Sequence, residues 1–129
     1  MIVVAAVIER NGLILIGQRR HDDRHPFKWE FPGGKVERRE APRDALAREL
    51  SEELDIRAVI GEELTRYTFR DPSRPIFELI FFRVTQFEGE PQNRVFEKIE
   101  WVKPEALPHY DFLDGDVKFV RSLARGAAR

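Results

Sequence analysis

The sequence predicts an α/β fold in which helices cover both faces of a mixed β-sheet. Short apolar runs separated by turns predict several strands, and residues 44–54 form an uninterrupted amphipathic segment that predicts a central helix. Apolar residues at helical spacing from Asp114 onward predict a second, terminal helix. With 129 residues and no internal repeat or shift in composition, the chain is expected to form one domain spanning residues 1–129.

The first two strands are predicted from the amino-terminal residues. Residues 2–8 are rich in Val, Ile and Ala, which is typical of a strand buried on both faces. Asn11-Gly12 is a strong hairpin signal, so residues 13–18 are expected to form the returning strand. Arg19 follows at the end of this strand, where the chain is expected to emerge into a site.

A polar loop, residues 21–28, then leads through Trp29-Glu30-Phe31-Pro32 to the glycine pair Gly33-Gly34. The side chain of Phe31 is expected to anchor the core. For Trp29 two roles remain open, a core anchor or a platform on which a base stacks. The glycine pair lets the backbone turn and approach a ligand closely.

The central helix is predicted to begin near Pro42, because proline suits the first helical position, where its missing N–H would be unpaired anyway. Neither Gly nor Pro interrupts residues 44–54. At about 100° per residue the leucines of this segment form one apolar stripe. They are Leu46, Leu50 and Leu54.

Glu49, Glu52 and Glu53 share a neighbouring face of this helix at spacing i, i+3, i+4. Like charges at this spacing repel, at a cost of roughly 0.2–0.5 kcal/mol per pair. The face is therefore either a solvated acidic surface or a cation site. A divalent cation such as Mg²⁺ prefers oxygen ligands and would offset the repulsion.

Further elements are predicted after this helix. Strands are expected at residues 57–60, 64–70, 76–87 and 99–102, a turn cluster at residues 71–75, and a single helical turn at residues 104–107.

The spacing of specific residues resembles the box that defines the Nudix hydrolase superfamily. The matching residues are Gly34, Glu40, Arg48-Glu49-Leu50, Glu52-Glu53 and Ile56. Asp55 departs from the pattern, which has glycine there. The resemblance implies a Nudix-type α/β/α sandwich with a mixed sheet, the box loop and helix at its centre and a C-terminal helix. We expect Asp55→Gly to keep activity and to raise stability, because glycine adopts left-handed backbone more freely.

The resemblance also implies a metal site and its ligands. Glu49, Glu52 and Glu53 would supply carboxylates, and Gly34 its carbonyl oxygen, to Mg²⁺ or to Mn²⁺. Glu40 would be a secondary ligand or a loop anchor.

Catalytic roles follow from the same resemblance. Arg48 would hold a box carboxylate in position, and Glu53 or Glu52 is the nearest candidate for the base that accepts a proton from water. Some relatives use a loop glutamate instead. An ungapped alignment on Trp101 places Val95 at that position, and Glu97 would replace it only if the loop shifts.

Within the superfamily, the segment from Trp29 to Lys35 resembles the MutT-like branch, which cleaves nucleoside triphosphates to the monophosphate and pyrophosphate. This implies a substrate surface that includes Trp29, Glu30 and Phe31. Arg19 matches an arginine that contacts the phosphates. Phe112 to Asp116 resembles a base-reading segment, with Asp116 in the place of an asparagine.

Two substrates are consistent with this reading. One is an oxidised purine nucleotide such as 8-oxo-dGTP, whose removal would protect DNA synthesis; this is slightly favoured. The other is CTP or dCTP. A different class, a nucleotide-binding module without catalysis, also remains, although retention of all three box glutamates and Arg48 favours an enzyme.

Composition excludes several other classes. The 22 basic and 23 acidic residues give a net charge of −1, so no basic field would hold nucleic acid non-specifically, and the expected partner is a small nucleotide. Cysteine is absent, which excludes disulfides and zinc–thiolate sites. The apolar start, residues 1–8, is too short for a membrane span and lacks a leader pattern. We expect a cytoplasmic monomer or homodimer.

Overall fold

Strand β1 (Ile2–Arg10) lies at the centre of the fold, and its side chains alternate between two cores. Val4, Ala6 and Ile8 point into one core, and Ala5 and Val7 point into the other. The burial of both faces that the apolar run predicted is confirmed. The computed structural model describes residues 1–72 and 75–127.

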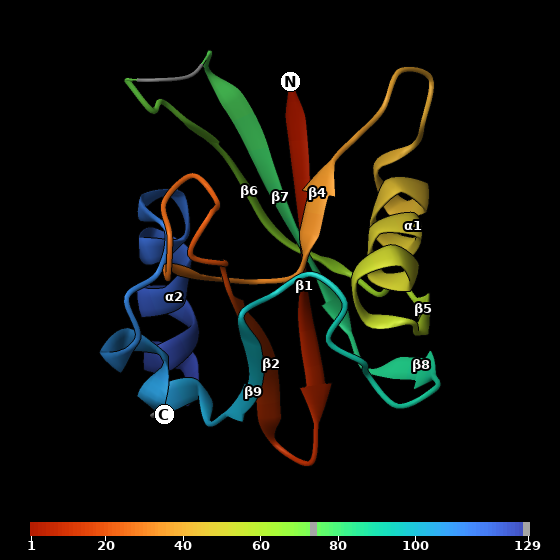
Figure 1. Ribbon diagram of the computed structural model, residues 1–129, viewed down its shortest axis with the longest axis vertical. Helices are drawn as coiled ribbons and strands as arrows, with labels where there is room; N and C mark the ends of the chain where they lie inside the picture. The colour runs from red at the N-terminus through yellow and green to blue at the C-terminus, as the bar shows by residue number, and fades with distance from the viewer. Residues whose placement is uncertain (73–74, 128–129) are drawn as a thin grey trace.

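The main sheet is mixed, as predicted (Figure 1). Its other strands are β2 (Leu13–Gln18), β3 (Trp29–Glu30), β4 (Gly33–Lys35), β6 (Glu63–Phe69), β7 (Phe77–Val84) and β9 (Lys98–Val102). Along its main path the order is β3-β2-β1-β7-β6, with β9 paired to β2. Strand β1 is parallel to β7, and its other partners are antiparallel. One half of β1 pairs with β4 at Val3–Ala5, and the other half pairs with β2.

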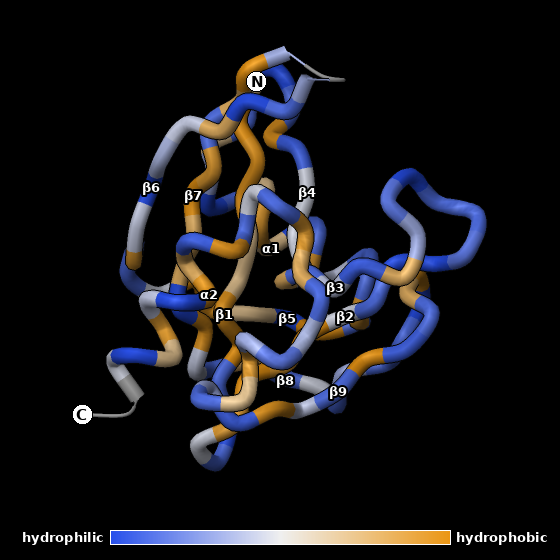
Figure 2. The backbone as a smooth tube through the Cα atoms, turned by 90° about the vertical axis from the view of Figure 1, so that its left-hand side faces the viewer, coloured by the Kyte–Doolittle hydropathy of each residue, from blue (hydrophilic) through white to orange (hydrophobic). Residues whose placement is uncertain are grey.

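Two helices cover opposite faces of this sheet and complete the predicted α/β/α sandwich (Figure 1). Helix α1 (Pro42–Leu54) begins at Pro42 as predicted, and its three leucines are fully buried in the core that includes Val4. Helix α2 (Asp114–Ala127) packs Phe119 and Val120 into the other core. The tube in Figure 2 is hydrophobic along β1 and β7, between these helices. In the described ranges, no helix is long and apolar enough to span a membrane.

Several predicted boundaries are wrong. The strand predicted at residues 76–87 is two strands, because the chain leaves the main sheet at Thr85 and continues as β8 (Gln86–Glu88). Strand β8 pairs with β5 (Arg57–Val59) in a separate small sheet. An apolar run does not show where a strand changes partner. Strands β3 and β4 were not predicted, since two or three residues give no periodicity.

The remaining predicted elements fall close to their observed positions. The helical turn predicted at residues 104–107 extends as the 3₁₀ helix η1 (Pro104–His109). Of the turn cluster predicted at residues 71–75, residues 73–74 lie outside the described ranges. The polar loop between β2 and β3 projects from the body and is largely hydrophilic (Figure 2).

Candidate active site

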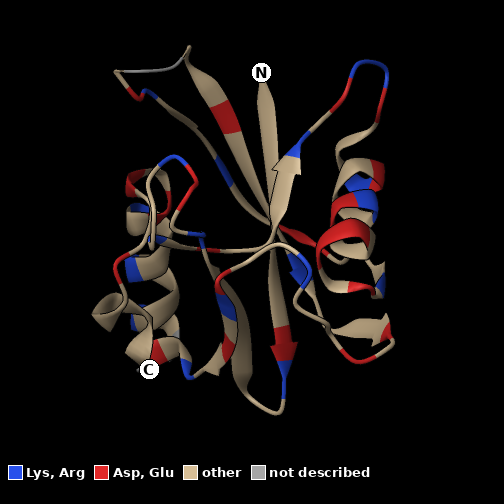
Figure 3. Ribbon diagram, viewed as in Figure 1, with Lys and Arg blue, Asp and Glu red and all other residues tan. Residues whose placement is uncertain are grey.

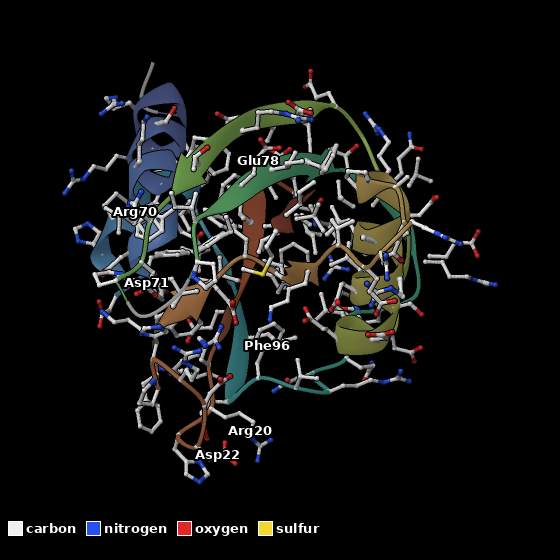
Figure 4. All side chains as sticks on the ribbon, turned by 90° about the horizontal axis from the view of Figure 1, so that it is seen from above. Arg20, Asp22, Arg70, Asp71, Glu78 and Phe96 are labelled. Carbon is white, nitrogen blue, oxygen red and sulfur yellow. The ribbon has the colours of Figure 1, made fainter. Side chains whose placement is uncertain are left out.

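A cavity of about 440 Å³ opens beside β4, within the size range of small-molecule sites. Its wall includes Glu53 of α1, Asp116 of α2, Glu30 of β3 and Asp71 of the loop after β6. Viewed from above in Figure 4, Asp71 and Phe96 mark two sides of this region, and the loop with Arg20 and Asp22 extends outward. Residues far apart in sequence thus share one cavity.

Gly33 and Gly34 belong to this wall, and at both positions the backbone packs so closely against its neighbours that little room remains for a side chain. A Cβ on Gly33 would lie 2.0 Å from the carbonyl oxygen of Val4, and a Cβ on Gly34 would lie 2.5 Å from the carboxyl carbon of Glu49. The Gly33 N–H donates a hydrogen bond of 3.1 Å to Oε1 of Glu53. The glycine pair therefore lies directly against the acidic face of α1.

We predict that Gly34→Ala lowers activity far more than stability. The added methyl group would meet the mobile end of Glu49 rather than backbone, so the fold should adjust at little cost. Displacing that carboxylate should lower catalytic efficiency about 10- to 100-fold. Thermal melts and steady-state kinetics test this, with Gly126→Ala as the matched control because nothing lies within 4 Å of its Cβ position. Normal turnover by Gly34→Ala would show that Glu49 need not occupy its observed position.

Two carboxyl groups of α1 lie together, that of Glu53 on the cavity wall and that of Glu49 beside it. Burial raises the pKa of Glu53 to about 9, and the charges of Glu30 and Glu49 contribute to this shift. Burial also raises the pKa of Glu49, whose carboxyl group shares a hydrogen bond with that of Glu53. The acidic positions of α1, separated by arginine, are visible in Figure 3.

Arg48 organises the carboxylates around it. Its guanidinium donates to both oxygens of Glu40 at 2.8 and 2.9 Å, to Glu49 at 3.0 Å and to the Lys35 carbonyl oxygen at 3.2 Å. These hydrogen bonds from Arg48, with one from the Glu37 N–H, lower the pKa of Glu40 to about 2. Of the two roles predicted for Glu40, the contacts support the loop anchor. Glu52 contacts Arg48 at 3.5 Å and its side chain is 58% exposed.

The donor chemistry fits a hard divalent cation. Glu49 and Glu53 are adjacent carboxyl groups whose charged forms are disfavoured by burial and by each other, and a cation would reverse that preference. Within residues 1–72 and 75–127, however, no three acidic or histidine side chains are already arranged around one point. Glu52 would have to turn from Arg48 to join the other two.

Arg19 and Glu30 both line the cavity and are paired with each other. Arg19 donates Nη1 to Glu30 at 3.1 Å, Nη2 to Asp23 at 2.8 Å and Nε to the Arg24 carbonyl oxygen at 2.9 Å. Burial raises the pKa of Glu30 to about 7, although the neighbouring Arg19 opposes the shift. A phosphate at Arg19 would therefore compete with carboxylates.

Asp116 lies in the first turn of α2 and is only 6% exposed. Burial and the charge of Glu30 raise the pKa of Asp116 to about 8, although a hydrogen bond from the Phe31 backbone acts to lower it. At neutral pH this carboxyl group therefore carries a proton and offers one donor and one acceptor.

The aromatic residues predicted for the substrate surface divide between wall and core. Phe31 is buried and lines the cavity. Phe112 packs on Phe31 with ring centroids 5.3 Å apart but lies in the core, outside the wall. Trp29 is 6% exposed, packs edge-on against Tyr110 at 5.0 Å, and is likewise absent from the wall. For Trp29 these contacts support the core anchor over the stacking platform.

The cavity also includes residues that the sequence did not single out. His25 and Lys28 of the polar loop, and Asp71 across from it, belong to the wall. His25 Nε2 lies 3.7 Å from Asp71 Oδ2, which links the two loops. No sequence signal marks these residues, because the position of a loop depends on the whole fold.

The loop before β9 brings Val95, and not a carboxylate, to the cavity wall. Glu97 instead lies 3.7 Å from His21, outside the wall. The loop is therefore not shifted in the way that would make Glu97 a substitute. Glu53 and Glu52 therefore stay the candidates predicted for the base.

Asp55 ends α1 with a left-handed backbone, φ 57°, as its place in the box predicted. The structure adds an ion pair that the sequence did not indicate, between Asp55 and Arg94 at 3.1 Å. Arg94 belongs to the loop that carries Val95.

We now expect Asp55→Gly to change the free energy of unfolding by less than about 1 kcal/mol. Relief of the left-handed backbone would contribute about 1 kcal/mol, and loss of an exposed ion pair would remove a similar amount at most. Urea unfolding of Asp55→Gly, Arg94→Ala and the double variant separates the two effects. A loss above about 2 kcal/mol in Asp55→Gly alone would exceed what the exposed ion pair can supply and would contradict this expectation.

Comparison with known proteins agrees with this geometry. The NUDIX domain family model matches residues 1–123. The chain is 40% identical to the CTP pyrophosphohydrolase of Escherichia coli K12, covering 98% of this chain and 94% of that protein. It is 38% identical to the 8-oxo-dGTP diphosphatase of Haemophilus influenzae, covering 95% and 91%. The solution structure of the E. coli ORF135 protein superposes with a TM-score of 0.86 at 39% identity, covering 99% of this chain and 91% of that one. The resemblance of the box residues is thereby confirmed, and the chain belongs to the Nudix family of hydrolases.

Proposed function

We propose that this Nudix hydrolase uses Mg²⁺, or Mn²⁺, to cleave a nucleoside triphosphate to the monophosphate and pyrophosphate. Nudix relatives of this chain are named as pyrophosphohydrolases and diphosphatases, so hydrolysis of a phosphoanhydride is the general reaction. One observation carries the finer proposal. A single cavity has Glu53, Asp116, Arg19 and Glu30 on its wall, and the charge of Glu30 acts on both Glu53 and Asp116.

The acidic end would hold the ion. Glu49, Glu52 and Glu53, with the Gly34 carbonyl oxygen, are the proposed ligands, and Arg48 fixes Glu49. A bound divalent cation would neutralise phosphate charge and lower the pKa of a water molecule. Glu53 or Glu52 would accept the proton of that water.

Arg19 would hold the phosphates. Both of its carboxylate partners line the cavity, but the side chain of Glu30 is 22% exposed on β3, whereas that of Asp23 is 41% exposed on the projecting loop. A phosphate oxygen is therefore proposed to replace Asp23, while Glu30 keeps the guanidinium in place. Arginine suits this exchange because its planar group binds carboxylate and phosphate alike.

Asp116 would read the base. A neutral carboxyl group pairs with an edge that offers one donor beside one acceptor. The 8-oxoguanine edge with N7–H and O6 has this pattern, and so does the cytosine edge with N4–H and N3. The corresponding edge of undamaged guanine has two acceptors, N7 and O6. We propose 8-oxo-dGTP as the first substrate, and CTP or dCTP as the second because the relative at 40% identity is named for CTP.

A pyrophosphate-release assay with Mg²⁺ on 8-oxo-dGTP, dGTP, CTP, dCTP, UTP and ATP tests the proposal. We expect 8-oxo-dGTP or the cytidine nucleotides to exceed dGTP at least tenfold, roughly the discrimination expected of one well-placed hydrogen bond pair. Removal of Mg²⁺ with EDTA should abolish turnover. Tight binding without release of pyrophosphate would indicate a nucleotide-binding module instead. Turnover of ADP-ribose or capped RNA in place of the triphosphates would assign a different Nudix activity.

The proposed partner is thus a small nucleotide, with no stable nucleic-acid complex. A cytoplasmic monomer or homodimer completes the proposal, and light scattering coupled to gel filtration would determine the oligomeric state.

A further inference from the structure

We propose that Glu30 is the residue that recognises the sugar, accepting a hydrogen bond from a hydroxyl group of the nucleotide's ribose or deoxyribose. This inference rests on the proposed nucleotide substrate and adds a determinant of sugar specificity to it. Three features carry it: the place of Glu30 near two other carboxyl groups, its ion pair with Arg19, and the chemistry of a carboxylate beside hydroxyl groups.

The backbone after Glu30 connects the base-reading and metal-binding ends of the cavity. The Phe31 backbone hydrogen-bonds the Asp116 carboxyl group, and two residues later the Gly33 N–H donates to Glu53. Two residues of backbone span at most about 7 Å. The charge of Glu30 acts on both carboxyl groups, which places it near each of them.

This segment is held firmly on the sheet. Glu30 pairs with Gly17 of β2, and the Pro32 carbonyl oxygen accepts a hydrogen bond of 2.8 Å from the Ala6 N–H of β1. The distance between the two ends of the cavity is therefore set by the sheet and not by a mobile loop.

A bound nucleotide must place its sugar between these ends. With phosphates at the α1 carboxylates and Arg19, and with the base at Asp116, the sugar is the part of the ligand that passes Glu30. Arg19 Nη1 donates to Oε1 of Glu30 at 3.1 Å, and the other oxygen, Oε2, is the one that we assign to the sugar hydroxyl group. A carboxylate on the wall of a nucleotide site commonly accepts from ribose hydroxyls, as in dinucleotide-binding folds.

The test compares sugars in the wild type and in two variants. The probes are cytidine and guanosine nucleotides with both hydroxyls, with the 3′-hydroxyl only, and with neither. Glu30→Gln keeps the shape of the side chain, and Glu30→Ala removes it. Glu88→Gln is the matched control, because Glu88 is 76% exposed and pairs with Arg57 on the small sheet.

In the wild type, loss of both hydroxyls should weaken binding and kcat/KM about tenfold or more, the range for a hydrogen bond to a charged group. In Glu30→Ala, loss of both hydroxyl groups should weaken binding and kcat/KM less than about threefold. The effect in Glu30→Gln should lie between those in Glu30→Ala and the wild type. Glu88→Gln should match the wild type. If both Glu30 variants weaken all three sugars by one common factor, Glu30 acts only through Arg19 and the proposal is overturned.

Calorimetric binding of the monophosphates separates this inference from the proposed reaction. Sugar discrimination that depends on Glu30, without any hydrolysis of triphosphates, would uphold the inference and reject the reaction. Hydrolysis of triphosphates with sugar preferences unchanged in the variants would uphold the reaction and reject the inference. Failure of the wild type to bind any of these monophosphates would overturn both.

Discussion

Glu53→Gln is expected to lower kcat about 100- to 10,000-fold, the range found when a group that moves a proton in the reaction is removed. Glutamine keeps the size of the side chain and can still accept a hydrogen bond from the Gly33 N–H, which holds Glu53 at 3.1 Å. It cannot carry the negative charge that a cation ligand or a base requires. The loss should therefore appear in kcat with the fold intact.

Metal-dependent stability gives a second measure of the same substitution. Mg²⁺ should raise the melting temperature of the wild type, because a ligand that binds the folded state stabilises it. Glu53→Gln should lose most of that increase. Glu62→Gln is a suitable control, since Glu62 pairs with Arg83 and its side chain is 69% exposed.

The dependence of stability on pH has a definite sign for this residue in the absence of metal. The folded pKa of Glu53, about 9, lies above the value near 4.3 of an exposed glutamate. The folded protein then binds more protons, so stability falls as pH rises from about 4 to about 9. In EDTA, Glu53→Gln should be the more stable protein at pH 8 and similar to the wild type at pH 4. Normal turnover, or a steeper loss of stability in the variant, would refute the role assigned to Glu53.

The elements that the sequence predicted well are those whose signal is local. The apolar run of β1 and the leucine stripe of α1 each report burial within a few residues, and both are confirmed. The spacing of the box residues also lies within one short segment. Strands β3 and β4 are too short for a periodic signal, and the change of sheet at Thr85 leaves the apolar run unbroken.

The site was only partly predictable because half of it is assembled by tertiary contacts. Glu30 and Asp116 lie 86 positions apart in the sequence, yet the charge of one raises the pKa of the other. The contact of Asp55 with Arg94 and that of His25 with Asp71 also join distant segments. Conversely, Trp29 and Phe112 carry the residue type of a stacking platform, but the fold uses them as core. Residue type indicates which chemistry is available, and packing decides whether a ligand can reach it.

Asp116→Asn is expected to stabilise the protein at alkaline pH, an unusual result for a substitution in a buried polar position. Burial and the charge of Glu30 raise the pKa of Asp116 to about 8, whereas an exposed aspartate has a pKa near 3.9. Stability of the wild type is therefore lost as pH rises from about 4 to about 8. Asparagine cannot ionise, so the variant should be more stable at pH 8 by an amount on the order of 2 kcal/mol, and nearly equal at pH 4.

Urea unfolding in EDTA at pH 4, 6 and 8 measures this directly. Asp114→Asn is the matched control, because Asp114 lies in the same first turn of α2 but is exposed. Its substitution should cost a few tenths of a kcal/mol, through weaker interaction with the helix dipole, and should show no comparable gain at pH 8. If Asp116→Asn is less stable than the wild type at pH 8, Asp116 is ionised and paired in the folded state, contrary to its burial.

The same variant tests how the base is read. A protonated aspartate offers a donor only below its pKa, so kcat/KM of the wild type for its best substrate should fall as pH rises through about 8. Asparagine offers a donor and an acceptor at every pH, so the fall attributable to Asp116 should disappear in Asp116→Asn while dependence on Mg²⁺ is unchanged. Persistence of the same fall in the variant would place the titrating group elsewhere, at Glu53 or Glu30. The base-reading and metal-binding ends of the cavity can therefore be told apart by which substitution changes the pH profile and which changes the response to the ion.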